Sequence, residues 1–131
     1  MTDAAPSRRR TRSGSPYEDL IGFSRAVRVG DRVLVSGTAP VWPDGSCADD
    51  AEVQAARCFE IIIGALAELG AGASDVVRTR MYIVDPGDAD AVGRAHRAAF
   101  ADAAPAASMV VVARLLDPRW KVEIEAEAVV G

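Results

Sequence analysis

The amino-acid sequence predicts an α/β fold, an α+β sandwich in which one mixed β-sheet carries two helices on one face. Two segments show apolar residues at helical spacing, and β-rich segments precede, separate and follow them in the order ββαβαββ. The chain has 131 residues, and half of them are apolar. That is enough for one domain whose core needs neither disulfides nor a metal ion.

The chain opens with a segment that differs in composition from the rest. The first 16 residues, MTDAAPSRRRTRSGSP, are polar and basic and contain Pro and Gly. We therefore expect a disordered basic tail over residues 1–16 and a single domain over residues 17–131. Two β-rich runs follow between residues 21 and 41, and Gly30-Asp31 between them is a hairpin signal.

Two helices and three strands complete the prediction. Between residues 49 and 70, apolar residues recur at helical spacing: Ala55, Phe59, Ile62, Ile63, Leu66 and Leu69. Residues 76–84 predict a strand, and residues 87–104 predict a second helix that ends before Pro105. Two further strands, joined by an Asp-Pro turn, reach the C-terminus.

The alternation of residues within the strands indicates what covers each face of the sheet. Each of two strands has one row suited to the core. These rows are Val77, Thr79, Met81 and Ile83 in one strand and Val122, Ile124, Ala126 and Ala128 in the other. The last strand then presents Glu123, Glu125 and Glu127 on its opposite face, where Arg78 and Arg80 can neutralise them. Residues 109–113 are apolar on both faces, which is typical of a strand buried on both sides. We therefore expect another copy of the chain to close the helix-free face.

Sequence motifs exclude several classes of site. His96 is the single histidine, so no multi-histidine metal site is available, and it is either a packed helix residue or a catalytic base. Cys47 and Cys58 lack metal-ligand spacing, and free thiols suit a reducing cytosol. No apolar run approaches the ~18–20 residues that span a bilayer. After residue 16 the chain has 11 basic and 18 acidic side chains, a net charge of −7, which argues against a nucleic-acid-binding surface on the fold. We expect a cytoplasmic protein with no metal, membrane or nucleic-acid partner.

Glu123 is the best candidate for chemistry among the three glutamates. It opens the last strand near the turn, where a cleft can admit a small molecule. A carboxylate half-buried beside Met109 would have a raised pKa and could transfer protons or orient water. The alternative is that Glu123 is only a salt-bridged sheet residue, which is the role we expect for Glu125 and Glu127.

Several stretches of the chain together resemble the Rid (reactive intermediate deaminase) or YjgF family. They are SPY at residues 15–17, VLVSGTAPV at 33–41, GAGASDVVRTRMYIVD at 70–85, and PAASMVVVARL followed by VEIEAEAV. The resemblance implies a chorismate-mutase-like fold and a homotrimer with ligand clefts between subunits. It also implies hydrolysis of small imines or enamines without a cofactor.

The resemblance assigns roles to individual positions. Glu123 would position the water. Tyr17 and the turn of Ser36, Gly37 and Thr38 would line the cleft. The arginine that binds the substrate carboxylate directly after Pro-Ala in deaminating members is absent, because Ala107 occupies that position. Arg80 is the preferred replacement cation, with Arg114 and Arg119 as other possibilities.

These positions lead to a functional hypothesis. Ala107, Met109 and Trp120 would make the cleft roomier and more apolar than in the deaminases. We expect a homotrimer that acts without a cofactor on a reactive imine, enamine or related carbonyl compound, with poor turnover of small 2-imino acids. The alternative is a non-catalytic trimer that binds a metabolite, and an RNA-acting protein is the least supported reading.

Overall fold

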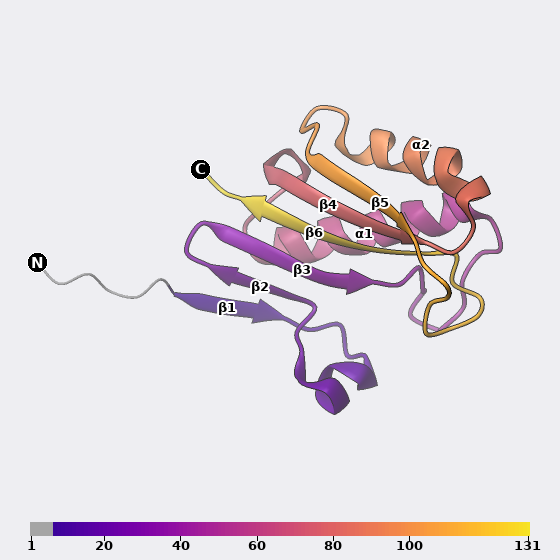
Figure 1. Ribbon diagram of the computed structural model, residues 1–131. Helices are drawn as coiled ribbons and strands as arrows, with labels where there is room; N and C mark the ends of the chain where they lie inside the picture. The colour runs from indigo at the N-terminus through magenta and orange to yellow at the C-terminus, as the bar shows by residue number, and fades with distance from the viewer. Residues whose placement is uncertain (1–6) are drawn as a thin grey trace, which may run out of the picture.

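A computed structural model describes residues 7–131, which form one layer of β-strands with two helices packed behind it (Figure 1). The six strands lie in the order β1-β2-β3-β6-β4-β5. Their bounds are Arg8–Thr11 (β1), Ala26–Val29 (β2), Arg32–Thr38 (β3), Val76–Ile83 (β4), Ala106–Val111 (β5) and Val122–Val129 (β6). The helices are Ala51–Glu68 (α1) and Ala89–Phe100 (α2), with short helical turns at Glu18–Gly22 (η1), Ala73–Asp75 (η2) and Pro86–Asp88 (η3). Strands β4 and β5 pair in parallel and the other neighbours pair antiparallel, so the predicted mixed α/β architecture is confirmed.

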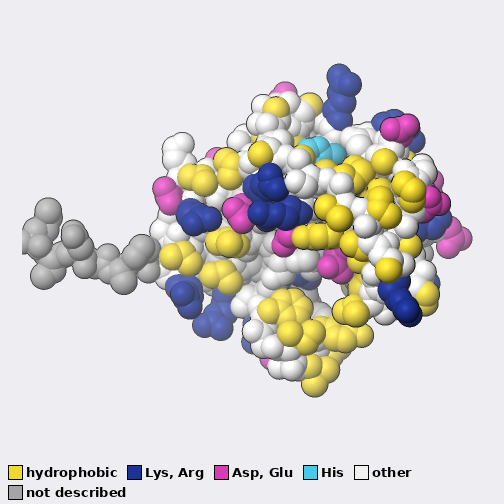
Figure 2. All heavy atoms as spheres, in the orientation of Figure 1, with side chains coloured by type: hydrophobic (Ala, Val, Ile, Leu, Met, Phe, Trp, Pro, Cys, Tyr) yellow, Lys and Arg dark blue, Asp and Glu magenta, His cyan; other side chains and the backbone are white. Residues whose placement is uncertain are grey.

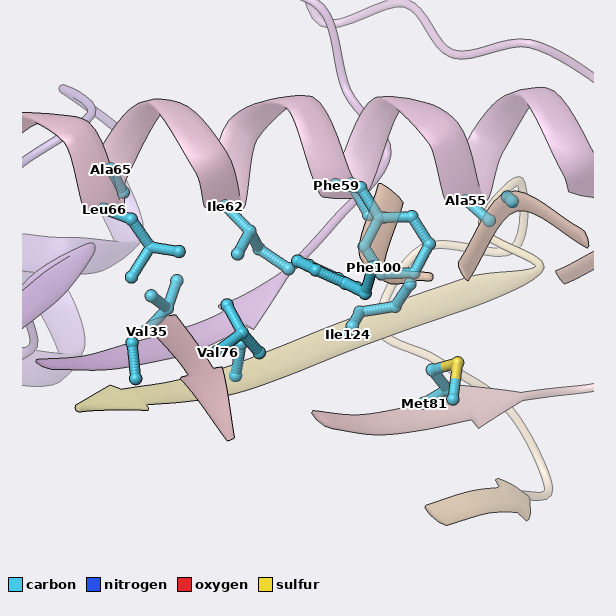
Figure 3. Packing of buried hydrophobic residues seen from close by; sticks show 14 of the residues in the cluster. Val35, Ala55, Phe59, Ile62, Ala65, Leu66, Val76, Met81, Phe100 and Ile124 are labelled. Atoms are coloured by element: carbon cyan, nitrogen blue, oxygen red, sulfur yellow. The ribbon is translucent and has the colours of Figure 1, made fainter. Parts of the chain in front are cut away.

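The core lies between the sheet and the helix pair. Phe59, Ile62 and Leu66 of α1 point toward the sheet, where Val35 and Ile124 meet them (Figure 3). All of these side chains are at most 3% exposed. The carboxylate of Asp50 accepts a hydrogen bond from the Val53 backbone N–H at 3.0 Å and so caps the start of α1. The helical face predicted from residue spacing is therefore the face that packs.

Strand β4 departs from simple alternation at its start. Thr79, Met81 and Ile83 are buried as expected, but Val77 is 45% exposed while Val76 is 2% exposed. The register between β4 and β6 shifts between Val76 and Arg78. Such a bulge inserts one residue and reverses the phase of the side chains before it. The prediction that Val77 belongs to the core row was therefore wrong.

The first described residues also differ from the prediction. Residues 8–11, assigned to a disordered tail, form β1, which pairs antiparallel with β2. The Arg9 guanidinium donates to the Leu69 carbonyl at 3.2 Å, and the Thr11 hydroxyl donates to the Glu68 carboxylate. Their side chains are mostly exposed, so no apolar pattern marks the strand, and it forms through backbone pairing with the edge of β2. The rest of the predicted tail up to residue 6 lies outside the described residues.

Strand β5 lies at the opposite edge of the sheet. Val110 and Val111 are 46% and 51% exposed in the single chain. One chain therefore covers neither side chain fully, and the burial on both faces that their apolar character predicts requires another molecule.

Candidate functional site

The helix-free face of the sheet carries paired charges over its middle. Basic and acidic side chains lie next to one another there (Figure 2). The Arg80 guanidinium is 3.8 Å from a carboxylate oxygen of Glu125 and 3.8 Å from one of Glu127. The Tyr82 hydroxyl donates to Glu125 at 2.6 Å, and Arg32 lies 3.6 Å from Glu127. Glu125 and Glu127 are thus neutralised as predicted, and Arg80 is engaged with them rather than free to bind a ligand.

A hollow lies over the part of the sheet that carries these ion pairs. Its walls come from β2, β3, β4 and β6, and they are formed by Val27, Leu34, Ser36, Arg80, Glu125 and Glu127, among others. Arg78, the second predicted partner of the glutamates, instead donates to the Ser108 hydroxyl at 2.9 Å. Glu123 does not line this hollow and lies further along β6.

Glu123 differs from the other two glutamates. Among the described residues it forms no ion pair within 4.0 Å, although it projects from the same face and lies opposite Tyr82 in the strand register. Burial raises the pKa of Glu123; the positive charge of Arg25 opposes this rise, and the negative charge of Glu125 adds to it. A carboxyl group with a raised pKa keeps its proton to a higher pH than an exposed one, which favours proton exchange with a ligand.

A glycine on β3 makes room for this carboxylate. A Cβ added at Gly37 would lie 2.7 Å from the Oε2 atom of Glu123, which is closer than such atoms can approach. The register between β3 and β6 shifts between Val35 and Thr38, so Gly37 lies within a bulge. Glycine in a strand often marks this kind of close approach.

Hydrogen bonds hold the bulge in place. The Ser36 hydroxyl donates to the Ser24 carbonyl at 2.7 Å, and the Thr38 hydroxyl donates to the Ser36 carbonyl at 2.8 Å. The buried thiol of Cys58 on α1 donates to the Thr38 carbonyl at 3.3 Å. Burial raises the pKa of Cys58 and the charge of Glu123 adds to this rise, so the thiol stays protonated. The predicted turn of Ser36, Gly37 and Thr38 therefore lies beside Glu123.

Arg25 completes this end of the face, and sequence reasoning missed it. Its guanidinium donates to the Gly37 carbonyl at 2.6 Å and lies over the Phe23 ring, 5.8 Å from its centroid. Burial lowers the pKa of Arg25, and the charges of Glu18 and Glu123 partly offset this effect. The signal was present in the sequence. Counting back from the Gly30-Asp31 turn places Arg25 opposite Ser36 in the hairpin.

The other predicted residues are described by their exposure and partners, and their roles in the site stay predictions. Tyr17 is 51% exposed at the start of η1, and its hydroxyl has no hydrogen-bond partner among the described residues. Trp120 is half-buried just before β6, and its indole Nε1 is shielded from solvent without a partner in the described part of the chain. Arg119 pairs with Asp117 at 2.9 Å, and Arg114 is exposed.

Ala107 and Met109 lie on a different face from Glu123 in the single chain. On β5 they pair with Thr79 and Met81 of β4, whose side chains are buried beneath the helices. Paired residues on neighbouring strands share a face. Strand β4 separates β5 from β6, so two strand spacings, roughly 10 Å, also separate them laterally from Glu123. A site that contains both Glu123 and the position of Ala107 needs two copies of the chain.

His96 is a packed helix residue, which is one of the two roles that the sequence left open. Its Nε2 atom lies 2.8 Å from the Thr79 hydroxyl, and its ring makes edge contacts with Phe59 and Phe100 at centroid distances of 5.7 and 5.4 Å. Burial lowers the pKa of His96. It lies beneath the sheet, away from the face that carries Glu123. Within residues 7–131 no three His, Cys, Asp or Glu side chains gather as metal ligands would.

Comparison with known proteins agrees with the motifs. Residues 16–130 match the family model described as Endoribonuclease L-PSP. A solved structure of Rv2704 from Mycobacterium tuberculosis, titled a member of the highly conserved YjgF/YER057c/UK114 family, is 42% identical. It superimposes with a TM-score of 0.88 over 95% of this chain and 100% of that one. The chain belongs to the YjgF family.

Curated members of the YjgF family include both uncharacterised and enzymatic proteins. SCO2049 of Streptomyces coelicolor, an uncharacterised protein, is 41% identical over 94% of this chain and 92% of its own length. The 2-iminobutanoate/2-iminopropanoate deaminase of Salmonella typhimurium is 35% identical over 82% of this chain and 86% of its own length. The predicted family is thus confirmed. No helix in the described part of the chain has the length and apolar character needed to cross a membrane.

Proposed function

We propose that this YjgF-family protein is a Rid-type enzyme that acts, without a cofactor, on a reactive imine, enamine or related carbonyl intermediate. The observation that carries this proposal is the state of Glu123. It is the one member of a row of three glutamates that lacks an ion-pair partner among the described residues, and burial raises its pKa. The similarity to a 2-iminobutanoate/2-iminopropanoate deaminase supports the reaction class.

The chemistry needs one group that exchanges protons. Hydrolysis of an imine adds water to the C=N carbon, and the resulting carbinolamine loses ammonia to leave a carbonyl group. Protonated Glu123 first gives its proton to the imine nitrogen, and the ionised carboxylate then takes a proton from the attacking water. It gives that second proton to the nitrogen, and as ammonia leaves it recovers a proton from the carbinolamine hydroxyl, which becomes the carbonyl group. For an enamine, the same acid first protonates carbon. A carboxyl group with a raised pKa suits both roles because the two forms coexist closer to neutral pH.

The active site in this proposal lies between copies of a homotrimer. Val110 and Val111 are exposed in the single chain, and Ala107 lies on the opposite face from Glu123. Packing of neighbouring chains would cover the first pair and bring the position of Ala107 to Glu123. Native mass spectrometry should give three times the chain mass, and a monomer at micromolar concentration would contradict this arrangement.

Substrate preference follows from the residue after Pro105-Ala106. Ala107 offers no guanidinium at the position where deaminating relatives hold a carboxylate. A bidentate arginine–carboxylate pair contributes about 1.5–3 kcal/mol. We therefore expect slow turnover of 2-iminobutanoate and 2-iminopropanoate, and faster turnover of larger, more apolar imines that can fill the space beside Ala107, Met109 and Trp120.

The direct test compares two glutamate variants. Imines are formed in situ from a panel of amino acids by an amino-acid oxidase, and ammonia release is followed. Glu123→Gln should reduce the rate enhancement by about 100-fold or more, whereas Glu127→Gln on the same strand should retain it. Equal activity of wild-type and Glu123→Gln proteins would refute the enzymatic role. If Glu123→Ala then kept affinity for a bound metabolite, the trimer would be a binding protein.

A further inference from the structure

Arg25 is a shielded cation without an ion-pair partner. Among the described residues no carboxylate lies within 4.0 Å of its guanidinium, whereas Arg12, Arg32 and Arg80 each have one. Its Nε is excluded from solvent and makes no hydrogen bond in the described part of the chain. The bond from Nη2 to the Gly37 carbonyl accounts for one donor of the five that a guanidinium offers. Removing a charged donor from water without a partner is unfavourable.

The nearest carboxylate on the open face is not free to satisfy Arg25. Glu123 approaches the Gly37 backbone from β6, and Arg25 approaches the Gly37 carbonyl from the start of β2. The two charged groups therefore flank one residue without forming an ion pair. The other nearby acid, Glu18, is buried, and its carboxylate accepts bonds from the Ser13 backbone and hydroxyl. Burial pushes the pKa of Glu18 up, but these bonds and the charges of Arg25 and Arg12 outweigh burial and lower it.

We propose that Arg25 binds an anionic group of the ligand, a carboxylate, next to Glu123. The assignment rests on the proposed function for its placement of the ligand at Glu123. The unpartnered Nε donor of Arg25 then receives an acceptor, and the ligand's negative charge lies beside a half-buried positive one. The subunit that carries Glu123 then supplies a cation itself, at a place other than that of Ala107. The ligand class is therefore larger imines or enamines that carry a carboxylate, while small 2-imino acids still lack the guanidinium beside Ala107.

The other arginines near this face do not compete for the role. Arg80 is shared between Glu125 and Glu127. The guanidinium of Arg78 donates to Ser108 on the edge strand β5, away from Gly37. Arg25 is therefore the arginine that combines shielding from solvent, free donors and a direct bond to the residue beside Glu123.

The test measures the affinity of a stable acid and of its neutral counterpart. The probes are 2-oxohexanoate and its methyl ester, titrated by calorimetry into the full-length protein. Arg25→Gln should weaken binding of the acid by about 10- to 100-fold and change binding of the ester by less than about 2-fold. The affinity of Arg25→Lys for the acid should lie between those of the wild type and of Arg25→Gln. Arg97→Gln, which removes an exposed arginine on α2, should match the wild type.

Several outcomes would overturn the assignment. Equal losses for acid and ester in Arg25→Gln would show that Arg25 only maintains the fold, and a change in oligomeric mass with an unchanged acid-to-ester ratio would place it in a subunit contact. Failure of the wild type to bind the acid at millimolar concentration would also overturn it. If Arg25→Gln does not fold, Arg25→Lys carries the comparison. Glu123→Gln should keep affinity for the acid while losing turnover, so a failure of Arg25 and a failure of the proposed reaction give different results.

Discussion

Replacing Gly37 with alanine tests the geometry of the site most directly. The new Cβ would lie 2.7 Å from Oε2 of Glu123, and ordinary contact begins near 3.4 Å. The carboxylate must therefore retreat by roughly 0.5 Å or more before the methyl group fits. The atom in conflict is the end of a flexible side chain, so the backbone need not move.

The structure predicts a small loss of stability and a larger loss of activity. Turning the Glu123 side chain away from its preferred rotamer costs about 0.5–1.5 kcal/mol. Alanine also restricts the unfolded chain more than glycine does, and this stabilises the folded variant by about 0.4–1 kcal/mol. The net change in unfolding free energy is then below about 1 kcal/mol, or a few degrees in Tm. Misplacement of a catalytic group by about 1 Å can cost about 100-fold in rate, so we expect kcat/KM to fall by roughly 10-fold or more.

The assay combines thermal unfolding with ammonia release from the imine panel. Gly64→Ala is the matched control because its new Cβ meets nothing within 4 Å, and Gly64 lies inside α1. That variant should gain about 0.5–1 kcal/mol in stability and keep full activity. A Gly37→Ala protein with wild-type activity, measured beside an inactive Glu123→Gln protein, would refute the claim that Gly37 fixes the position of the carboxylate.

Three further predictions concern other parts of the molecule. Because burial raises the pKa of Glu123 in the folded protein, the native state keeps that proton longer than the unfolded state. The contribution of Glu123 to stability should therefore fall as pH rises above the ordinary glutamate value of 4.5, and urea unfolding should show Glu123→Gln becoming more stable relative to the wild type from pH 4.5 toward neutrality. Ala107→Arg should raise kcat/KM for 2-iminobutanoate by about 10-fold or more if subunits share the site, and no gain would count against a shared cleft. Removal of residues 1–11 should lower Tm and promote aggregation in light scattering, because it exposes the edge of β2; an unchanged Tm would show that β1 contributes little.

Much of the fold could be predicted because its signals are local. The helical spacing in α1 and the alternation in β6 each mark the face that is buried in the core. In β6 the predicted residues, Val122, Ile124, Ala126 and Ala128, are all at most 3% exposed. Val77 could not be placed in the same way. Its exposure depends on a bulge against β6, which is distant in sequence, and alternation assumes an uninterrupted register.

The candidate site was less predictable for the same reason. Glu123 could be chosen because it opens the last strand near the turn, and Glu125 and Glu127 could be assigned to ion pairs, which they form with Arg80 and Arg32. Arg25 was missed because its importance depends on the bulge at Gly37, which brings residues from three separate strands or strand ends together. The resemblance to the Rid family pointed to Tyr17, whose side chain is 51% exposed in the single chain, and its role in the cleft stays a prediction.

The distribution of charge differs between the two ends of the open face. At one end, Arg80 and Arg32 neutralise Glu125 and Glu127, and paired charges of this kind can be covered by another subunit at little net electrostatic cost. At the other end, Arg25 and Glu123 remain unpaired on either side of Gly37. If the face served only for contact between subunits, an ion pair between Arg25 and Glu123 would lower the cost of shielding each charge from water. Their separation is instead what a ligand requires if it carries an anion for one group and an exchangeable proton for the other.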